Sequence, residues 1–288
     1  MYRKPDWSRE GLDWPLREAS QFIFAGGIKW HVQSLGKGPV ILLLHGTGAA
    51  THSWHKLIPL LASKYTIVAP DLPGHGFTAT PQGDGLSLPG MAALISALLV
   101  QLDIKPFAII GHSAGAPLGA ELILTNQVPA RHLVAINGAF KPFDGVAAHI
   151  FPVVAKAIAL NPVTIFALAS GGGNSARVAK LMQATGSRLD ARSLELYRRL
   201  FGTPGHVAGV MGMMARWELA KLASRLPNLA TPTTLIVGSN DLTISPQVSA
   251  DVSKLLPNSQ IVTFKGLGHL VHEEDPEGVA QAIIAALR

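Results

Sequence analysis

The stretch FAIIGHSAGAPLG, residues 107–119, decides the fold of this 288-residue chain. It begins with an apolar run typical of a buried strand, passes through a serine, and continues with apolar residues at helical spacing. In the pattern G-x-S-x-G a strand turns sharply into a helix and presents the serine at the apex, because Gly111 and Gly115 lack Cβ atoms that would keep the two elements apart. The pattern predicts that Ser113 is a nucleophile, although a serine that only caps a helix also fits this pentapeptide.

Apolar runs typical of strands alternate with runs typical of helices on both sides of this stretch. The first two strands form a hairpin around Gly26-Gly27, and helices separate the later ones, which is the pattern of a mostly parallel sheet covered on both faces. We therefore expect an α/β fold with eight strands, at residues 21–25, 28–35, 40–46, 65–71, 107–113, 132–138, 233–239 and 260–266. Helices are expected at residues 53–63, 89–102, 114–126, 245–256 and 275–287.

The alternation of strands and helices stops at about Phe140. From there until just before the strand expected at 233–239 only helical patterns occur, with Gly and Pro between them. The sequence GGGN at 171–174 indicates a joint inside this helical region. We therefore expect a first core part at residues 1–140, an all-helical cap at 141–229 inserted after the sixth strand, and a second core part at 230–288.

The cap carries the positive charge of the chain. The formal net charge is +6 at neutral pH, and residues 141–225 hold 11 Lys or Arg against 4 Asp or Glu, whereas the remainder holds 13 against 14. A basic surface suits acidic small molecules, acidic proteins or peripheral contact with an anionic membrane, and equally a face that is only solvated. Nucleic acid is not expected, because no basic run is interleaved with aromatic residues.

Composition and spacing exclude several other classes of protein. The chain has no cysteine, which rules out disulfides and thiolate metal sites. The spacing His269-x-x-His272-Glu273 differs from the H-E-x-x-H zinc pattern, so we expect no metal and no cofactor. The polar N-terminus lacks the apolar segment of a signal peptide, and Pro89 interrupts the apolar run at 85–102. We therefore expect a cytoplasmic protein, with the cap as the one region suited to peripheral membrane contact.

Two further residues follow strands of the expected sheet, at whose carboxyl ends ligand-binding residues gather. Asp241 follows the strand at 233–239, and His269 follows the strand at 260–266. The chain order Ser113, Asp241, His269 is that of a hydrolase triad. In such a triad the histidine takes the serine proton, and the aspartate fixes the imidazole tautomer and stabilises the imidazolium. We predict that these three residues are catalytic.

The loop HGTGAA, residues 45–50, follows the strand expected at 40–46. A tetrahedral intermediate of acyl transfer needs two N–H donors aimed at its oxyanion. Ala114, the residue after the nucleophile, is expected to supply one, and Thr47 in this loop the other. A dinucleotide-binding loop is the alternative, but Thr51 stands where a third glycine or alanine belongs, and the first acid at a strand end, Asp71, lies 25 residues beyond Gly46.

With these features in place, the chain resembles the α/β-hydrolase superfamily over nearly its whole length. The resemblance rests on HGTG, DLPGHG, GHSAG, VGSND and GLGH, and the serine in GHSAG differs from the aspartate of haloalkane dehalogenases and epoxide hydrolases. A narrower resemblance is to the magnesium-chelatase-associated α/β-hydrolases of bacteriochlorophyll biosynthesis, the BchO family. It rests on DWPLREAS, HGTGAATHSWHKLIPLLA, TGSRLDA and TPGHVAGVMGMMARWEL. It implies a photosynthetic bacterium, a role near magnesium insertion into a porphyrin, and magnesium chelatase subunits as partners.

The cap stretch 207–217 offers an adaptable apolar surface for a bulky substrate. Its candidate substrate-binding residues are Met211, Met213, Met214 and Trp217, with His45 and His112 from the core; ordinary packing of cap on core is the competing interpretation. Two functions stay open. One is a serine hydrolase acting on an ester of a bulky apolar acid, with a tetrapyrrole as candidate. The other is a binding or escort protein for porphyrin in which the triad is idle.

Overall fold

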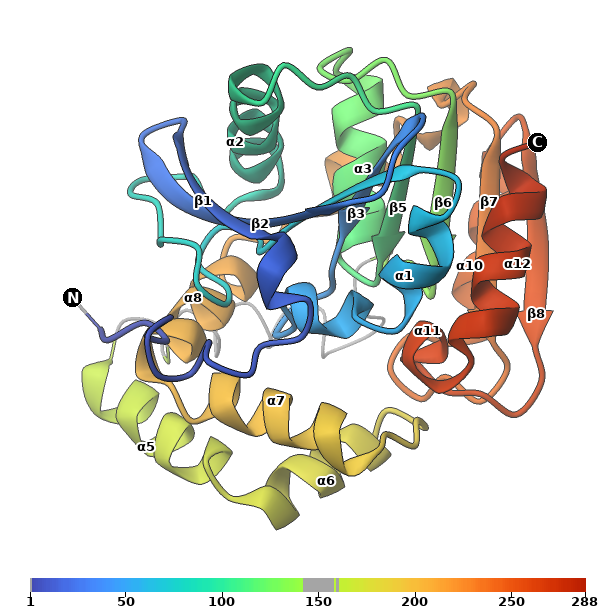
Figure 1. Cartoon of the computed structure of the whole chain (residues 1–288). Coiled ribbons are helices and arrows are strands. Elements are labelled where there is room, and N and C mark those ends of the chain that lie inside the picture. The colour runs from blue at the N-terminus through green and yellow to red at the C-terminus, as the bar shows by residue number, and fades with distance from the viewer. Residues whose placement is uncertain (1, 142–157, 159–160) are drawn as a thin grey trace.

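The computed structural model describes residues 2–141, 158 and 161–288 (Figure 1). Its strands form one eight-stranded sheet in the order β1-β2-β4-β3-β5-β6-β7-β8. β2 runs antiparallel to β1 and β4, and all other neighbours are parallel, as the sequence predicted. The strands are β1 Ser20–Ala25, β2 Ile28–Leu35, β3 Val40–Leu44, β4 Thr66–Pro70, β5 Ala108–His112, β6 His132–Ile136, β7 Thr233–Gly238 and β8 Ser259–Phe264.

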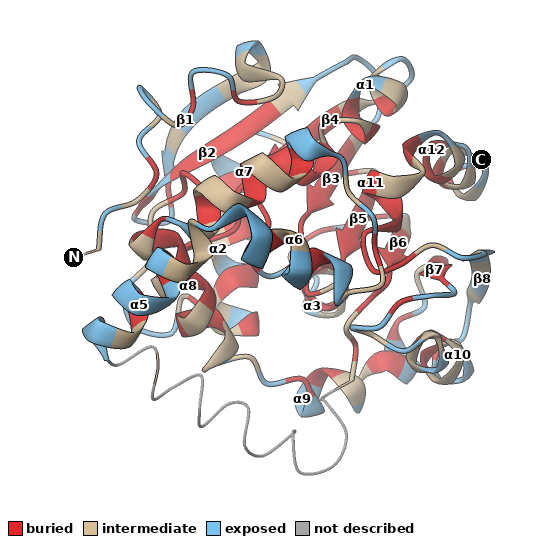
Figure 2. Ribbon diagram, turned by 90° about the horizontal axis from the view of Figure 1, so that it is seen from below, coloured by how far each residue is buried: buried red, intermediate tan, exposed pale blue. Residues whose placement is uncertain are grey.

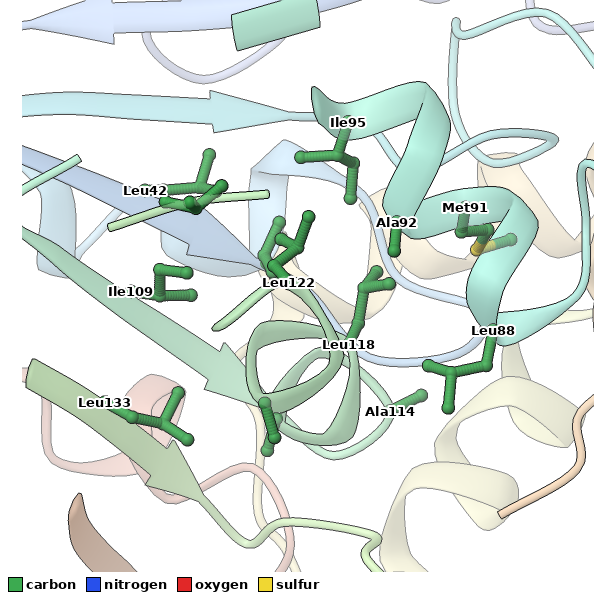
Figure 3. Packing of buried hydrophobic residues seen from close by; sticks show 14 of the residues in the cluster. Leu42, Leu88, Met91, Ala92, Ile95, Ile109, Ala114, Leu118, Leu122 and Leu133 are labelled. Atoms are coloured by element: carbon green, nitrogen blue, oxygen red, sulfur yellow. The ribbon is translucent and has the colours of Figure 1, made fainter. Parts of the chain in front are cut away.

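Helices cover both faces of the sheet, so its central strands are apolar on both sides. In β3, Ile41 and Leu43 pack on one face with α1 (Leu57–Ala62) and α12 (Pro276–Ala286). Leu42 and Leu44 pack on the other with α2 (Leu88–Gln101), α3 (Gly115–Leu124) and α10 (Pro246–Leu255). Figure 3 shows this second cluster, in which leucines of α3 meet those of the strands. Every strand and helix expected in the two core parts is present.

The described part of the cap lies between β6 and β7 and contains helices only. They are α5 Pro162–Gly172, α6 Ser175–Gln183, α7 Ala191–Phe201, α8 Pro204–Met214 and α9 Ala220–Ala223. Asn161, Asn174 and Asp190 cap α5, α6 and α7 by accepting backbone N–H bonds, which satisfies donors that a helix start leaves unpaired. The Gly-rich stretch at 171–174 joins α5 to α6. Residues 142–157, 159 and 160 of the expected cap lie outside the described residues.

The segment before β1 connects the core to the cap, which the sequence did not predict. The Lys4 amine donates to the carbonyl of Gly74 over 2.7 Å. Asp13 accepts bonds from Arg192 and Arg199 of α7. Asp13 therefore pairs part of the cap's positive charge with an acid from the N-terminal segment. No helix in the described ranges is long and apolar enough to cross a bilayer.

Candidate active site

Ser113 lies between β5 and α3 in a sharp turn. Its φ is +50°, a strained conformation for a residue with a side chain, which costs about 1–3 kcal/mol. The turn is tight because the glycines around it allow close approach. A Cβ at Gly115 would lie 2.0 Å from the Leu44 carbonyl oxygen, and one at Gly111 would lie 2.3 Å from the Gly115 carbonyl carbon. The backbone N–H of Ser113 donates to Ile136 over 3.0 Å, so neighbouring strands hold the strained residue in place.

Asp241 and His269 form a buried hydrogen-bonded pair beyond β7 and β8. The His269 Nδ1 donates to Asp241 Oδ2 over 2.7 Å, which fixes the tautomer that leaves Nε2 as a base. The other carboxylate oxygen of Asp241 accepts the N–H groups of Thr243 and Ile244, both at 2.8 Å. Asp241 and His269 are 4% and 6% exposed, so the pair is shielded from water.

Ser113 and His269 line the same cavity. Within the described residues the Ser113 hydroxyl makes no hydrogen bond. Proton-transfer contacts of this kind often tighten only once substrate is bound. The shared cavity therefore gives a bound molecule access to both Ser113 and His269.

Asn137 supports this pair, and the sequence analysis missed it. It follows β6, is 1% exposed and has φ of +46°. Its amide nitrogen donates to Asp241 Oδ2 over 2.6 Å and to the Gly268 carbonyl over 3.0 Å, and its oxygen accepts the Gly238 N–H over 3.0 Å. The strand expected at 132–138 ends in Asn137 and Gly138 and carries no carboxylate there. Because β6 lies between β5 and β7, any polar residue at its carboxyl end was a candidate.

The cap also contacts both loops that carry this pair. The carbonyl of Thr185 accepts the backbone N–H of His269 over 3.3 Å and that of Leu242 over 3.2 Å. Gly186 has φ of +84°, and a Cβ there would lie 2.0 Å from the Asn240 carbonyl oxygen. The cap therefore fixes the spacing of the acid loop and the histidine loop.

The predicted oxyanion donors, Thr47 and Ala114, both line the cavity. Within the described part of the chain, neither backbone N–H has an acceptor. Ala114 precedes α3, where the helix dipole also favours negative charge. A Cβ on Gly46 would lie 3.0 Å from that of Ser113, so the loop lies directly against the serine turn. Two unpaired donors beside a serine are the arrangement that a tetrahedral oxyanion requires.

The two histidines predicted to bind substrate have different surroundings. His45 does not line the cavity: its Nε2 accepts the Leu72 N–H over 2.9 Å, and its Nδ1 donates to the Gly46 carbonyl over 2.8 Å. Both ring nitrogens are therefore occupied within the protein, next to the loop at 45–50, and a substrate contact by His45 stays a prediction. His112 does line the cavity, and its Nε2 donates to the His269 carbonyl over 2.9 Å. Burial holds the pKa of His112 well below its usual value, so it adds no positive charge beside His269.

A buried carboxyl group lies behind His269. Burial raises the pKa of Glu273 to about 7. Its Oε1 accepts the hydroxyl of Ser53 and that of Tyr197 from α7, both at 2.7 Å. In the sequence Glu273 stood out only as part of a spacing that does not match the H-E-x-x-H zinc pattern. Instead it joins the histidine loop to the cap.

The cavity above Ser113 has a volume of about 1040 Å³ and mostly apolar walls, the upper end of the range for small-molecule sites, roughly 300–1,000 Å³. Met211, Met213, Met214 and Trp217 all line it, as do Lys141, Arg177 and Arg216. Lys141 is paired with Asp251. Among the described residues Arg177 and Arg216 form no ion pair, and Glu218 lines the same cavity.

The strained serine, the buried Asp–His pair and the two free N–H groups on this sheet define a hydrolase-type site. The family described as alpha/beta hydrolase fold matches residues 39–276, and the chain belongs to that family. It is similar to the "Magnesium-chelatase 30 kDa subunit" of Rhodobacter capsulatus, with 39% identity over 94% of this chain and 95% of that protein. This match confirms the resemblance to the magnesium-chelatase-associated α/β-hydrolases.

More distant proteins share the same fold. The 2-hydroxy-6-oxo-2,4-heptadienoate hydrolase of Pseudomonas putida is 23% identical over 92% of this chain and 95% of that protein. The crystal structure of an alpha/beta hydrolase fold protein from Burkholderia ambifaria has a TM-score of 0.78 with 21% identity, covering 99% of this chain and 100% of that one. This structural match shows the fold alone.

Proposed function

We propose that the chain is a serine hydrolase in which Ser113, His269 and Asp241 form the triad and Thr47 and Ala114 the oxyanion hole. One observation carries the proposal: a hydrogen-bonded Asp241–His269 pair and a strained serine meet at one cavity that also holds two unpaired backbone donors. A binding protein has no need for all of these groups together.

The chemistry follows from the positions of these groups. The Ser113 Oγ attacks the carbonyl carbon of an ester while His269 Nε2 takes its proton, and the oxyanion is bound by the two N–H groups. The C–O bond to the alcohol then breaks, and His269 returns the proton to the departing oxygen. Water, deprotonated by the same histidine, releases the acid and restores Ser113.

The cavity supports a substrate with a bulky apolar acyl part. Four cap side chains, Met211, Met213, Met214 and Trp217, supply an adaptable apolar wall. Arg177 and Arg216 offer partners for a carboxylate on the same molecule. A tetrapyrrole combines an apolar plate with carboxylate edges, and the name of the Rhodobacter relative supports a role near the magnesium chelatase step of bacteriochlorophyll biosynthesis.

The alternative is an escort protein that binds porphyrin for magnesium insertion without turnover. The same large apolar cavity and the relative's name support it. Under this alternative Ser113→Ala assists magnesium insertion as well as the wild type. Under the hydrolase proposal that variant still binds the ester and does not cleave it.

Turnover of a panel of esters, from a short acetate to porphyrin monoesters, tests the proposal. Asp241→Asn should reduce kcat by orders of magnitude, approaching the roughly 10⁴-fold fall seen for the equivalent change in a serine protease. If Asp241→Asn lowers kcat by less than about threefold, the assignment of Asp241 is contradicted. Cleavage of no ester by the wild type would favour the escort alternative.

A further inference from the structure

The outer face of α5 and α6 is unusually apolar for an exposed surface. Large apolar side chains of the two helices are between 44% and 74% exposed: Val163 and Phe166 on α5, Leu181 on α6, and Leu168, which points to the opposite side of α5 from Phe166 and lines the cavity. Phe166 also contacts Tyr2 edge-on, with ring centroids 5.7 Å apart. Figure 2 shows exposed segments on both helices, seen from the cap side. We call this surface, together with Arg177 and Lys180, the α5–α6 face. Clustered exposed apolar residues mark interaction sites, whereas scattered ones do not.

The same face is basic and contains no acid. Residues 161–189 include Arg177, Lys180 and Arg188 and no Asp or Glu. Within the described ranges Arg177 and Lys180 form no ion pair, whereas Arg198 of α7 is paired with Glu195. Arg177 and Lys180 therefore lie on the same two helices as the exposed apolar side chains, and they are two of several cap cations, with Arg188, Arg216 and Lys221, that form no ion pair among the described residues.

The α5–α6 face is continuous with the cavity. Leu168, Arg177 and Leu181 belong to both: they are exposed on the surface and also line the cavity above Ser113. The surface of the two helices and the cavity therefore share a border that Leu168, Arg177 and Leu181 form.

We propose that the α5–α6 face docks onto a lipid bilayer that carries anionic headgroups. Val163, Phe166 and Leu181 enter the boundary between headgroups and acyl chains, Lys180 contacts the headgroup phosphates, and Arg177 stays at the border with the cavity. The combination of exposed apolar residues with unpaired cations fits this partner better than an acidic protein, which would leave the apolar side chains uncovered. Docking then brings the side of the cavity lined by Leu168 and Leu181 next to the lipid, so that an apolar ester passes from the bilayer to Ser113; this last step rests on the proposed function.

Flotation of the full chain with vesicles tests the docking. Wild-type protein should bind vesicles of equal phosphatidylcholine and phosphatidylglycerol, bind phosphatidylcholine alone weakly, and dissociate as salt screens the charges. Lys180→Glu and the double change Val163→Ser and Phe166→Ser should each weaken binding by about tenfold. Two matched controls should bind vesicles as the wild type does. They are Val100→Ser, at a position 78% exposed on α2, and Lys105→Glu, at an exposed lysine outside the cap.

Hydrolysis of a short soluble ester separates this proposal from the function proposed above. None of Val163, Phe166 and Lys180 lines the cavity, so their variants should cleave the soluble ester at the wild-type rate and lose activity only toward an ester held in vesicles. Vesicle binding without cleavage of any ester would refute the hydrolase proposal and leave the docking surface standing. The docking proposal is overturned if the wild type and the double variant Val163→Ser, Phe166→Ser bind vesicles equally, or if neither binds. A protein would then be the better candidate partner for this face.

Discussion

Replacing Glu273 by Gln should stabilise the protein at neutral and alkaline pH. The carboxyl group lies at 2% exposure behind His269, and burial raises its pKa from 4.5 to about 7. The folded state therefore binds the proton more tightly than the unfolded state. Between about pH 4.5 and pH 7 the folded protein holds more protons, so this group makes stability fall as pH rises through that window.

The size of the effect follows from the difference in pKa. A difference of about two and a half pKa units corresponds to about 3 kcal/mol, at 1.36 kcal/mol per unit, as an order of magnitude. Glutamine keeps the oxygen that accepts from Ser53 and Tyr197 and carries no charge to desolvate. Relative to wild type, Glu273→Gln should gain little at about pH 5 and up to about 3 kcal/mol at about pH 8.

Urea denaturation of both proteins between about pH 5 and pH 8 measures this difference. The buried histidines, including His112 and His272, have pKa values lowered by burial. They therefore add stability as pH rises in both proteins, and their effect is removed by subtraction. Glu277→Gln, at an exposed position of α12, controls for loss of a surface carboxylate. A difference that is constant with pH, or that shrinks as pH rises, would refute the reasoning.

Three further changes test other parts of the site. Asn137→Ala removes a donor to the Asp241 carboxylate, so kcat should fall roughly 10- to 100-fold, for a bond worth about 1.5–3 kcal/mol; a fall below about threefold in steady-state kinetics would count against its positioning role. Gly186→Ala should cost about 1–3 kcal/mol and lower Tm, because φ is +84° and a Cβ has no room, whereas at Gly173 the nearest atom to a Cβ is 3.5 Å away and the same change should be close to neutral. Met214→Ala should raise KM for bulky apolar esters and leave KM for a short acetate unchanged, since the side chain lines a cavity much larger than an acetate; equal effects on both would show that it serves packing.

The sequence predicted the sheet because its signals are local. Runs such as VILLL and AIIGH, bounded by Gly and polar residues, reveal buried strands, and all five residues of β5 are buried. The rule that ligand sites gather at the carboxyl ends of parallel strands then placed Ser113, Asp241 and His269 at one edge. In the structure Asp241 and His269 are hydrogen-bonded, and His269 lines the same cavity as Ser113.

What the sequence left out depends on contacts between distant segments. The amide of Asn137 reaches a carboxylate 104 positions away, and Thr185 of the cap contacts the His269 backbone. Neither residue carries a pattern of its own. The basic character of the cap was visible from composition. Only the structure shows which of its cations are ion-paired: Arg199 is paired with Asp13, whereas Arg177 has no acidic partner among the described residues.

Reaction with a fluorophosphonate probe tests the central claim most directly, because it needs no knowledge of the natural substrate. Mass spectrometry of the digested protein should find one adduct, on the peptide that contains Ser113, formed by the wild type at neutral pH. Ser113→Ala should give no adduct while keeping the wild-type fold by circular dichroism. Equal labelling of the two proteins, or no labelling of a correctly folded wild type, would contradict the assignment of Ser113 as an activated nucleophile.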